Sequence, residues 1–281
     1  MNSFLKFDSS DDVVKWAFEM CRDEGEKVSP RGMLTYEVPV VGFELTSPRK
    51  RKISWSKRGW SSGLGAAEAA WHLSGSRDVD ILAHYAKSWK KYSDDGLRVN
   101  GSCYGAKIFS GGENSQWEVA KQILKNDLDS RRSVIVTDAT VSSDLYTLDK
   151  SCLTSMQFLV RDGRLHAVVN MRSNDVYLGL PYDIFLFTIF QERMAFELDI
   201  SLGSYFHIAS SFHLYDRDLE RVNRKGGFGS SYTQEMATLD FNEVNNFIAA
   251  EVAFRKSGAW LGNVSSGWEE LVADLRNFAN K

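Results

Sequence analysis

A hairpin signal in the middle of the chain constrains the fold most strongly. Two strand-forming stretches, Met156–Arg161 and Leu165–Met171, flank the dipeptide Asp162-Gly163. A two-residue hairpin turn requires positive φ at both of its central residues, and Asp and Gly tolerate that conformation. An apolar run from Ile184 to Leu198 follows and has the length of a helix. This part of the chain therefore predicts two antiparallel strands of a sheet, followed by a helix.

The rest of the pattern mixes helices and strands irregularly. Helices are expected at Asp11–Glu24, Leu64–Leu73, Asp78–Tyr92, Glu118–Asp127, Asn242–Phe254 and Gly267–Ala279. Strands are expected at Thr35–Leu45, Ser133–Thr137 and Tyr205–Tyr215. Irregular alternation favours an α+β fold with a mixed sheet. Without repeats or linkers, residues 1–281 are interpreted as a single domain, with a loop at Lys225–Gly229.

Charge and composition argue against several classes of protein. The net charge of −3 gives no case for binding nucleic acid, since proteins that track phosphates are usually basic. No run of about twenty apolar residues predicts a membrane helix, and the N-terminus does not resemble a signal peptide. The three cysteines, Cys21, Cys103 and Cys152, favour a reducing, cytoplasmic compartment. No Cys/His spacing predicts a metal site.

Cys152 is the candidate nucleophile. A lone cysteine is usually a small buried apolar residue, and reactivity requires cationic neighbours that favour the thiolate. Arg131-Arg132 and Arg172 are possible neighbours in the fold. The same arginines, with Arg31, can instead grip a phosphate through their forked donors, or lie solvated at the surface.

Two carboxylates have both a structural and a functional interpretation. Glu68 lies among alanines in a predicted helix, where it is either an exposed helix former or a proton carrier with a raised pKa. Asp183 precedes the apolar helix, where it is either the N-cap or a functional group.

Polar and aromatic pairs add weaker signals. His213 and Tyr215 alternate along a strand and face the same side, as core residues or as partners of a sugar hydroxyl. Trp89 and Tyr92 lie one helical turn apart and form either core or a stacking platform.

The order of these motifs resembles that of the thymidylate synthase family. Residues 68–75 resemble the family's catalytic-glutamate helix. The motifs that follow in the family's order are Trp89, Tyr104-Gly105, Asp129-Ser130-Arg131-Arg132, Cys152 with Gln157-Phe158, Arg172-Ser173-Asn174-Asp175, Gly179-Leu180-Pro181-Tyr182 and His213-Leu214-Tyr215. The resemblance runs from about Arg31 to Tyr215. It implies the family's α+β sandwich, with the mixed sheet forming the interface of an obligate homodimer.

The resemblance also implies roles for individual residues. Cys152 would attack C6 of a pyrimidine nucleotide monophosphate, and Glu68 would order water and move protons. The residues implied for substrate binding are Arg31, Arg172 and Ser173 at the phosphate, Arg131 and Arg132 from the partner subunit, His213 and Tyr215 at the sugar, and Tyr104 and Gln157. Those implied for the cofactor 5,10-methylenetetrahydrofolate are Trp89, Asp175, Leu178, Gly179 and Tyr182.

Asp183 departs from the synthases, which carry Asn after Gly-Leu-Pro-Phe/Tyr. An amide supplies one acceptor and one donor, which match N3–H and O4 of uracil. A carboxylate accepts from the 4-amino group of cytosine, and a protonated carboxyl can in addition donate to N3. Because a site built for one pattern leaves the other base's polar groups unpaired, Asp183 predicts a cytosine base.

Further departures point the same way. Residues 167–176 resemble phage deoxycytidylate hydroxymethylases more than synthases, and Leu153 replaces the His that follows the nucleophile in most synthases. The closing C-terminal segment of the synthases is not recognised, which is compatible with water as the final nucleophile. The expected activity is 5-hydroxymethylation of dCMP. Left open are a CMP hydroxymethylase of nucleoside-antibiotic type, a dUMP-using synthase or hydroxymethylase, an inactive nucleotide- or RNA-binding regulator, and a purely structural protein.

Overall fold

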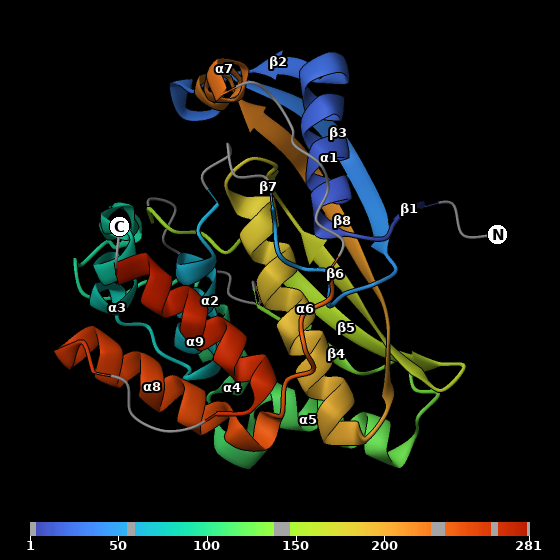
Figure 1. The fold of residues 1–281 in the computed structure, drawn as a ribbon. Helices are drawn as coiled ribbons and strands as arrows, with labels where there is room; N and C mark the ends of the chain where they lie inside the picture. Colours follow the sequence, from blue (N-terminus) through green and yellow to red (C-terminus); the bar gives the residue numbers. More distant parts are fainter. Residues whose placement is uncertain (1–3, 55–59, 138–146, 226–233, 260–263, 280–281) are drawn as a thin grey trace.

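A mixed sheet forms the centre of the molecule (Figure 1). The computed structural model describes residues 4–54, 60–137, 147–225, 234–259 and 264–279. Of the predicted loop Lys225–Gly229, Lys225 is instead the last residue of a helix, and residues 226–229 lie outside the described ranges. The strands are β1 (Leu5–Phe7), β2 (Glu26–Val28), β3 (Thr35–Leu45), β4 (Val134–Val136), β5 (Leu153–Arg161), β6 (Arg164–Met171), β7 (Asn174–Asp175) and β8 (Ser201–Tyr215). Their order is β1-β3-β8-β6-β5-β4, with β2 on β3 and β7 on β8. The pairs β1/β3, β6/β8 and β7/β8 are parallel and the others antiparallel, so the predicted mixed sheet is confirmed.

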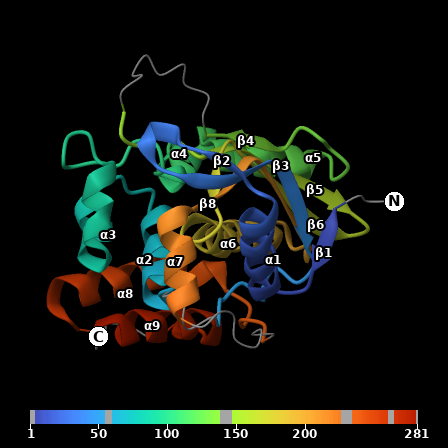
Figure 2. The same ribbon diagram turned by 90° about the horizontal axis from the view of Figure 1, so that it is seen from above.

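Helices cover one face of this sheet. They are α1 (Ser10–Glu24), α2 (Ser62–Leu73), α3 (Val79–Tyr85), α4 (Tyr104–Phe109), α5 (Gln116–Asn126), α6 (Gly179–Leu198), α7 (Asp216–Lys225), α8 (Val244–Ser257) and α9 (Ser266–Ala279). The long helix α6 lies against β6 and β8, and α2 packs between α6 and the pair α8 and α9 (Figures 1 and 2). None of the helices in the described ranges is long and apolar enough to span a membrane. The α+β class predicted from the sequence is confirmed.

The predicted hairpin is present and joins β5 to β6. Asp162 and Gly163 take φ of 51° and 68°, the left-handed conformations that this turn requires. Along both strands buried and partly exposed residues alternate, because one face meets the helices. Apolar side chains also lie on the opposite face near its edge, where Val134 and Val136 of β4 are 41% and 40% exposed.

The helix expected from Ile184 begins earlier, at Gly179. Pro181 therefore lies within the first turn, where a residue without an N–H is tolerated because that N–H would have no partner in the helix. Leu178 is the N-cap residue, and it makes no side-chain cap. The N-cap interpretation of Asp183 is thus wrong, since this residue lies inside α6.

The single helix expected at Asp78–Tyr92 is divided. Ala86 takes φ −147° and ψ 102°, so α3 ends at Tyr85 and a 3-10 helix covers Lys87–Tyr92. The break turns Trp89 toward α2, where its ring lies 6.1 Å from that of Trp71. Periodicity could not predict the break, because packing against α2 fixes it rather than local propensity.

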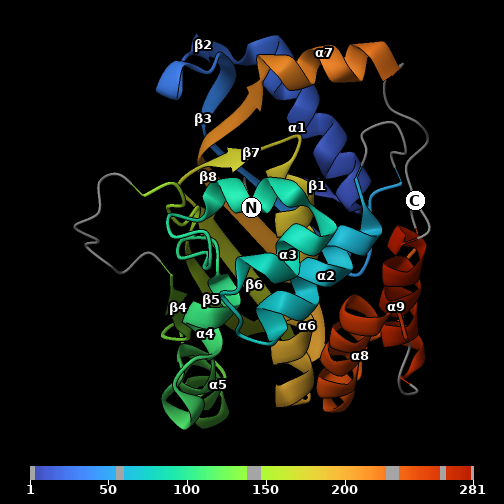
Figure 3. The same cartoon turned by 90° about the vertical axis from the view of Figure 1, so that its left-hand side faces the viewer.

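Strand β3 begins beside β2, and β8 ends next to the start of β3, where α7 follows (Figures 1 and 3). The sequence pattern predicts β3 with its observed bounds and predicts β8 from Tyr205 instead of Ser201. The short elements β1, β2, α4 and α7 are not predicted. Strands β1 and β2 have three residues each and depend on pairing with β3, and α4 has only six residues, too few to show a helical period.

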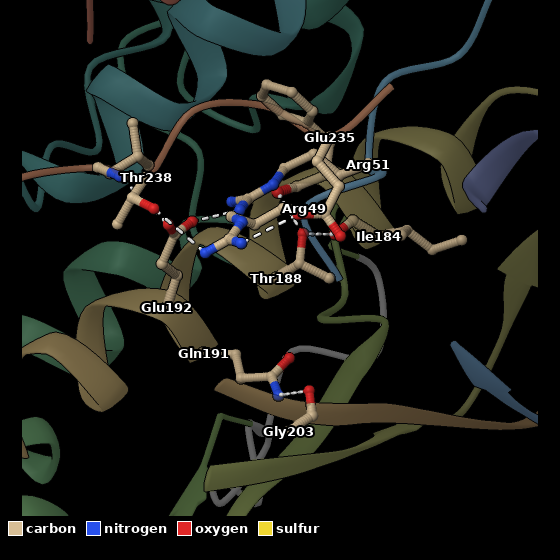
Figure 4. A network of polar contacts seen from close by, with 11 residues as sticks. Arg49, Arg51, Ile184, Thr188, Gln191, Glu192, Gly203, Glu235 and Thr238 are labelled. Carbon is tan, nitrogen blue, oxygen red and sulfur yellow. Dashed lines mark hydrogen bonds and ion pairs between the residues drawn. The ribbon is translucent and has the colours of Figure 1, made fainter. Parts of the chain in front are cut away.

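A buried ion pair links the segment between β3 and α2 to α6 (Figure 4). The guanidinium group of Arg51 is fully buried and pairs with Glu192, whose other oxygen accepts the backbone N–H of Leu239 at 3.1 Å. Nε and Nη1 of Arg51 have no partner among the described residues. Among the described residues, Glu192 is therefore the group that compensates the buried positive charge of Arg51.

We expect Glu192→Ala to lower the free energy of unfolding by about 3–5 kcal/mol, because it leaves a buried charge without its partner. Urea denaturation measures the loss. The matched control is Glu235→Ala, which breaks the exposed pair with Arg49 in the same network and should cost no more than about 1 kcal/mol. A loss below about 1 kcal/mol for Glu192→Ala would contradict this account of the pair.

Candidate active site

Cys152 lies immediately before β5 and is held close to Arg172 at the end of β6. Nη2 of Arg172 is 3.5 Å from the Cys152 sulfur. Nε and Nη2 of the same guanidinium donate to the carbonyls of Ser151 (2.7 Å) and Lys150 (2.8 Å). These bonds fix the guanidinium across the turn that carries the thiol. The predicted arginine neighbour of the thiol is therefore present, and it is Arg172.

Burial nevertheless raises the pKa of Cys152 to about 11. Arg172 and Arg31 favour the thiolate, whereas the carboxylates of Asp183 and Asp149 oppose it. The thiol is thus protonated at neutral pH before substrate binds. The arginines thus act in the predicted direction, and burial acts more strongly in the opposite one.

Asp183 lies within the same group of side chains. Its Oδ2 accepts a hydrogen bond of 2.7 Å from Nδ2 of Asn174. Burial raises the pKa of Asp183 to about 7, the Asn174 hydrogen bond opposes this rise, and Asp175 adds to it. Near neutral pH this carboxyl group therefore exists in both charge states.

Glu68 projects from α2 toward this carboxyl group. Burial, and then the charge of Asp183, raise the pKa of Glu68 to about 8. The indole of Trp89 hydrogen-bonds Glu68 and acts in the opposite direction. The functional interpretation of the Ala-rich helix is favoured, because Glu68 is a carboxyl group that holds its proton at neutral pH.

Tyr104 starts α4 and is buried beside the same groups. Burial raises its pKa well above the usual range, and the charges of Cys152 and Asp183 raise it further. Asp183 also raises the pKa of Cys152 and Glu68, so Cys152, Glu68 and Tyr104 all lie close enough to Asp183 to be affected by its charge. We call Cys152, Glu68, Tyr104 and Asp183 the central cluster.

Arg31 and the end of β8 lie next to the central cluster. Arg31 takes φ 52°, which is rare for a residue with a Cβ and is found most often at functional sites. Its side chain hydrogen-bonds Tyr215, and its charge lowers the pKa of Cys152. The guanidinium of Arg217 also lies over the Tyr215 ring, at 4.4 Å. Two cations thus meet at this end of the sheet.

His213 lies two residues before Tyr215 on β8, and the two rings are 5.2 Å apart. The predicted common face of the two residues is confirmed. Nδ1 of His213 is buried and has no hydrogen-bond partner among the described residues. Since buried polar atoms are rarely left unpaired, this nitrogen is suited to a ligand.

Asp175 and Leu178 form the turn that leads into α6. Oδ1 of Asp175 accepts the backbone N–H groups of Tyr177 (2.8 Å) and Leu178 (3.1 Å). This turn leaves the Leu178 side chain 43% exposed. Gly179 follows, and a Cβ there would lie 3.4 Å from Nδ2 of Asn174 and 3.5 Å from Oδ2 of Asp183, which places this turn in contact with both side chains.

The side chain of Tyr182 contacts the residues that precede α2. Its hydroxyl accepts the N–H of Ser61 at 3.0 Å, and its ring lies 6.0 Å from that of Trp60. Trp60 and Ser61 line a cavity of about 280 Å³ with Phe278 of α9. Nε1 of Trp60 is buried and has no acceptor in the described part of the chain.

Three predicted site residues lie elsewhere in the subunit. Arg131 and Arg132 precede β4 at the edge of the sheet and are exposed. Nε2 of Gln157 donates to the carbonyl of Arg131 at 2.7 Å. The structure therefore does not bring these three together with the central cluster of their own chain. Ser173 follows Arg172 and is half-buried.

Sequence reasoning missed the residues that support the central cluster. Asp149 is buried and accepts the N–H groups of Gly101 (2.6 Å) and Ser102 (2.7 Å), which anchors the segment before Cys152. Asn174 and His207 were assigned no role. A signal was present for His207, because it occupies an inward position of β8, where an apolar residue is expected. Across the described ranges, no group of three or more His, Cys, Asp or Glu side chains could hold a metal.

Comparison with known proteins identifies the family. The sequence profile described as thymidylate synthase matches residues 52–252, which is more than half of the chain. This chain belongs to the thymidylate synthase family. The family predicted from motif order is thereby confirmed, and so is the fold. The thermostable thymidylate synthase A from Bacillus subtilis superposes with a TM-score of 0.64 at 20% identity, over 79% of this chain and 86% of that one.

Two relatives of this member of the thymidylate synthase family come from phages. The chain is 30% identical over 239 residues to the deoxyuridylate hydroxymethyltransferase of Bacillus phage SP01. The aligned region covers 79% of this chain and 62% of that protein. It is 29% identical over 178 residues to the protein of the same name from Pseudomonas phage M6, which covers 62% of this chain and 50% of that protein. The chain thus matches only part of the length of either relative.

Proposed function

We propose that this chain is a 5-hydroxymethyltransferase that acts on dCMP. It would use 5,10-methylenetetrahydrofolate and water, and would release 5-hydroxymethyl-dCMP and tetrahydrofolate. Membership of the thymidylate synthase family supports one-carbon transfer to a pyrimidine nucleotide. The observation that carries the choice of base is Asp183, which stands within the central cluster beside Cys152 and Glu68.

Asp183 would recognise the base through its neutral form. A neutral carboxyl group donates one hydrogen bond and accepts another, which matches N3 and the 4-amino group of cytosine. The raised pKa of about 7 supports this role, because a large share of the molecules carry the proton at neutral pH. The site would then supply a proton to N3 as charge develops on the ring.

The nucleotide would lie between the arginines and the end of β8. Arg172 and Arg31 would bind the 5′-phosphate, together with Ser173, since guanidinium groups match phosphate oxygens. His213 and Tyr215 would bind the 3′-hydroxyl of the sugar. The unpaired Nδ1 of His213 supports that assignment, because a sugar hydroxyl would satisfy it.

The Cys152 thiol would give its proton to solvent, and the thiolate would add to C6, which makes C5 nucleophilic. Arg172, 3.5 Å from the sulfur, would stabilise the thiolate as it forms. Glu68 would orient the water that adds to the exocyclic methylene group on C5. Because its pKa is raised to about 8, Glu68 can both take and return a proton near neutral pH. Cys152 then leaves C6, and Tyr104 would contact the ring during these steps.

The residues beside α6 fit a flat heteroaromatic ligand such as the folate. Exposed Leu178 and the partly buried rings of Trp89 and Tyr182 offer apolar surface, and Asp175 and Gly179 lie in the turn that carries Leu178. The unpaired Nε1 of Trp60 next to the cavity supports a polar ligand there. When bound, the folate supplies the one-carbon unit. These residues would orient it and help to exclude water until the transfer is complete.

A homodimer would complete the phosphate site. Arg131 and Arg132 lie away from the central cluster of their own subunit, so we propose that they reach the phosphate of the partner subunit. The partly exposed apolar edge at Val134 and Val136 supports a partner on that face of the sheet. That the chain is a single domain, acting in the cytoplasm, likewise stays a prediction.

A dUMP hydroxymethyltransferase is the second candidate. Both phage relatives are named deoxyuridylate hydroxymethyltransferases. A neutral carboxyl group can also match uracil, by accepting from N3–H and donating to O4. CMP remains the ribose alternative, because Arg172 and Ser173 at the phosphate do not by themselves distinguish the two sugars.

Release of tritium from C5 separates these candidates. The enzyme is incubated with the folate and with 5-tritiated dCMP, dUMP or CMP in parallel. We expect dCMP to be preferred over dUMP by about 10²-fold in kcat/KM, because cytosine is matched by both charge states of Asp183 and can take its proton at N3, whereas the carboxylate form repels O4 of uracil. A preference for dUMP would transfer the proposal to the second candidate, and tritium release no faster than in a blank without enzyme would favour a catalytically inactive family member.

A further inference from the structure

A line of hydrogen-bonded side chains runs from Asp183 into the core. Nδ2 of Asn174 donates to Oδ2 of Asp183 at 2.7 Å. Oδ1 of Asn174 lies 2.9 Å from Nε2 of His207. Nδ1 of His207 lies 2.8 Å from the hydroxyl of Tyr205. We call Asn174, His207 and Tyr205 the relay.

The relay is held rigidly by the sheet. Asn174 is 2% exposed, and His207 and Tyr205 are fully buried. Asn174 belongs to β7, which pairs with β8, and the two other residues occupy successive inward positions of β8. The His207 ring also stacks on Phe43 at 5.1 Å with an angle of 11° between the planes. Three strands thus fix the direction of every bond in the relay.

The donors of the relay all point toward Asp183. Because the amide nitrogen of Asn174 faces the carboxylate, its oxygen must accept from His207. His207 therefore carries its proton on Nε2, which leaves Nδ1 to accept from the Tyr205 hydroxyl. Burial lowers the pKa of His207 to about 3, so the ring is neutral and has one donor and one acceptor.

We propose that Asn174, His207 and Tyr205 are positioning residues that stabilise the negative charge of Asp183 when this group gives its proton to the base. The proposal rests on the function proposed above and deepens it. In that step the O–H bond of Asp183 breaks and an N–H bond forms at N3, while the electron pair stays on the carboxylate. A chain of donors aimed at that carboxylate strengthens as the charge develops. The reverse transfer restores the neutral acid.

Burial and the charge of Asp175 on β7 oppose the ionisation of Asp183. Once ionised, Asp183 raises the pKa of the neighbouring Glu68 of α2, Cys152 before β5, Tyr104 of α4 and Tyr205 of β8. None of these five groups donates a hydrogen bond to Asp183 in the described part of the chain. The Asn174 bond is therefore what offsets burial and the charge of Asp175 at Asp183.

Carbon-13 NMR of the aspartate carboxyl groups tests this without any substrate. Asp183→Asn identifies the signal, which is then titrated in each variant. We expect Asn174→Leu and His207→Leu to raise the pKa of Asp183 by about one unit, because each removes stabilisation of the carboxylate. His207→Gln should largely restore the pKa, since its amide can donate to Asn174. Thr188→Val, which removes a hydroxyl bonded only within α6, should leave the pKa unchanged.

Kinetics supply a second readout that simple structural damage would not move. The neutral form of Asp183 is the active acid, so activity falls as pH rises through its pKa. In Asn174→Leu that alkaline limb should move to higher pH, while kcat with dCMP falls about 10- to 100-fold and KM stays within about threefold. Partial unfolding would scale kcat without moving the limb. Tyr205→Phe, the mildest change, should move the limb in the same direction by less.

An unchanged pKa of Asp183 in both Asn174→Leu and His207→Leu would overturn the proposal. So would an alkaline limb that stays in place. If instead the wild-type protein turns over no pyrimidine nucleotide, the proposed function fails, and the NMR titration still decides whether the relay stabilises the carboxylate.

Discussion

Cys152→Ser is expected to lower turnover of dCMP by at least about 10³-fold while nucleotide binding stays within about threefold. A hydroxyl group at this position is a far weaker nucleophile than a thiol. Neither Arg172 nor Arg31 can ionise it, because burial already raises the pKa of the thiol to about 11 in their presence. The hydrogen bonds of Arg172 to the backbone of Ser151 and Lys150 are kept in the variant, so the phosphate site should stay intact.

The measurement combines tritium release from 5-labelled dCMP with calorimetric titration of dCMP. Cys103→Ser is the matched control, because its sulfur donates only to the carbonyl of Asn100 at 3.3 Å, and a hydroxyl can do the same. The control should keep activity within about threefold. Turnover by Cys152→Ser at more than about a tenth of the wild-type rate would remove Cys152 as the nucleophile.

Asp183→Asn is expected to change the base preference from cytosine toward uracil by about 10³-fold in the ratio of kcat/KM. An amide cannot give up a proton to N3, so cytosine loses the step that the carboxyl group serves. With uracil the amide oxygen accepts N3–H, and its nitrogen donates to O4. Nδ2 of Asn174, which donates to Asp183 at 2.7 Å, would still find an acceptor in the amide oxygen.

Parallel assays with dCMP and dUMP measure the ratio, and a stability profile checks the fold of the variant. The folded carboxyl group of Asp183 has a raised pKa of about 7, so ionisation costs stability as pH rises from the unfolded value near 4 through 7. Asparagine does not ionise. The melting temperature of the variant relative to wild type should therefore rise between pH 4 and pH 8. An unchanged base ratio would contradict the role given to Asp183.

Local signals predicted much of the fold. The Asp162-Gly163 turn needs only its own two residues to take positive φ, so the hairpin followed from a dipeptide. The strand Thr35–Leu45 followed from alternation and its content of Val and Tyr, although Val40, with φ 53°, interrupts the regular strand. The start of α6 was not predicted correctly. The sequence pattern places Pro181 before the helix, but a proline in the first helical turn breaks no hydrogen bond, and the helix includes it.

The candidate site was predictable where it follows motif order and not where it depends on pairing between strands. The thiol, Arg172 and Asp183 lie in one continuous stretch, and the structure places them together. Asn174 and His207 are brought into contact by the parallel pairing of β7 and β6 with β8, a register that no local pattern specifies. The raised pKa of Cys152 was likewise hidden, since burial depends on what packs around the turn.

The identity of the product tests the central claim most directly. Wild-type protein is incubated with dCMP and 5,10-methylenetetrahydrofolate, and mass spectrometry identifies the nucleotide while absorbance follows the folate. The account predicts 5-hydroxymethyl-dCMP, with tetrahydrofolate and no dihydrofolate. A 5-methyl nucleotide formed together with dihydrofolate, or a hydroxymethylated product from dUMP and none from dCMP, would contradict it.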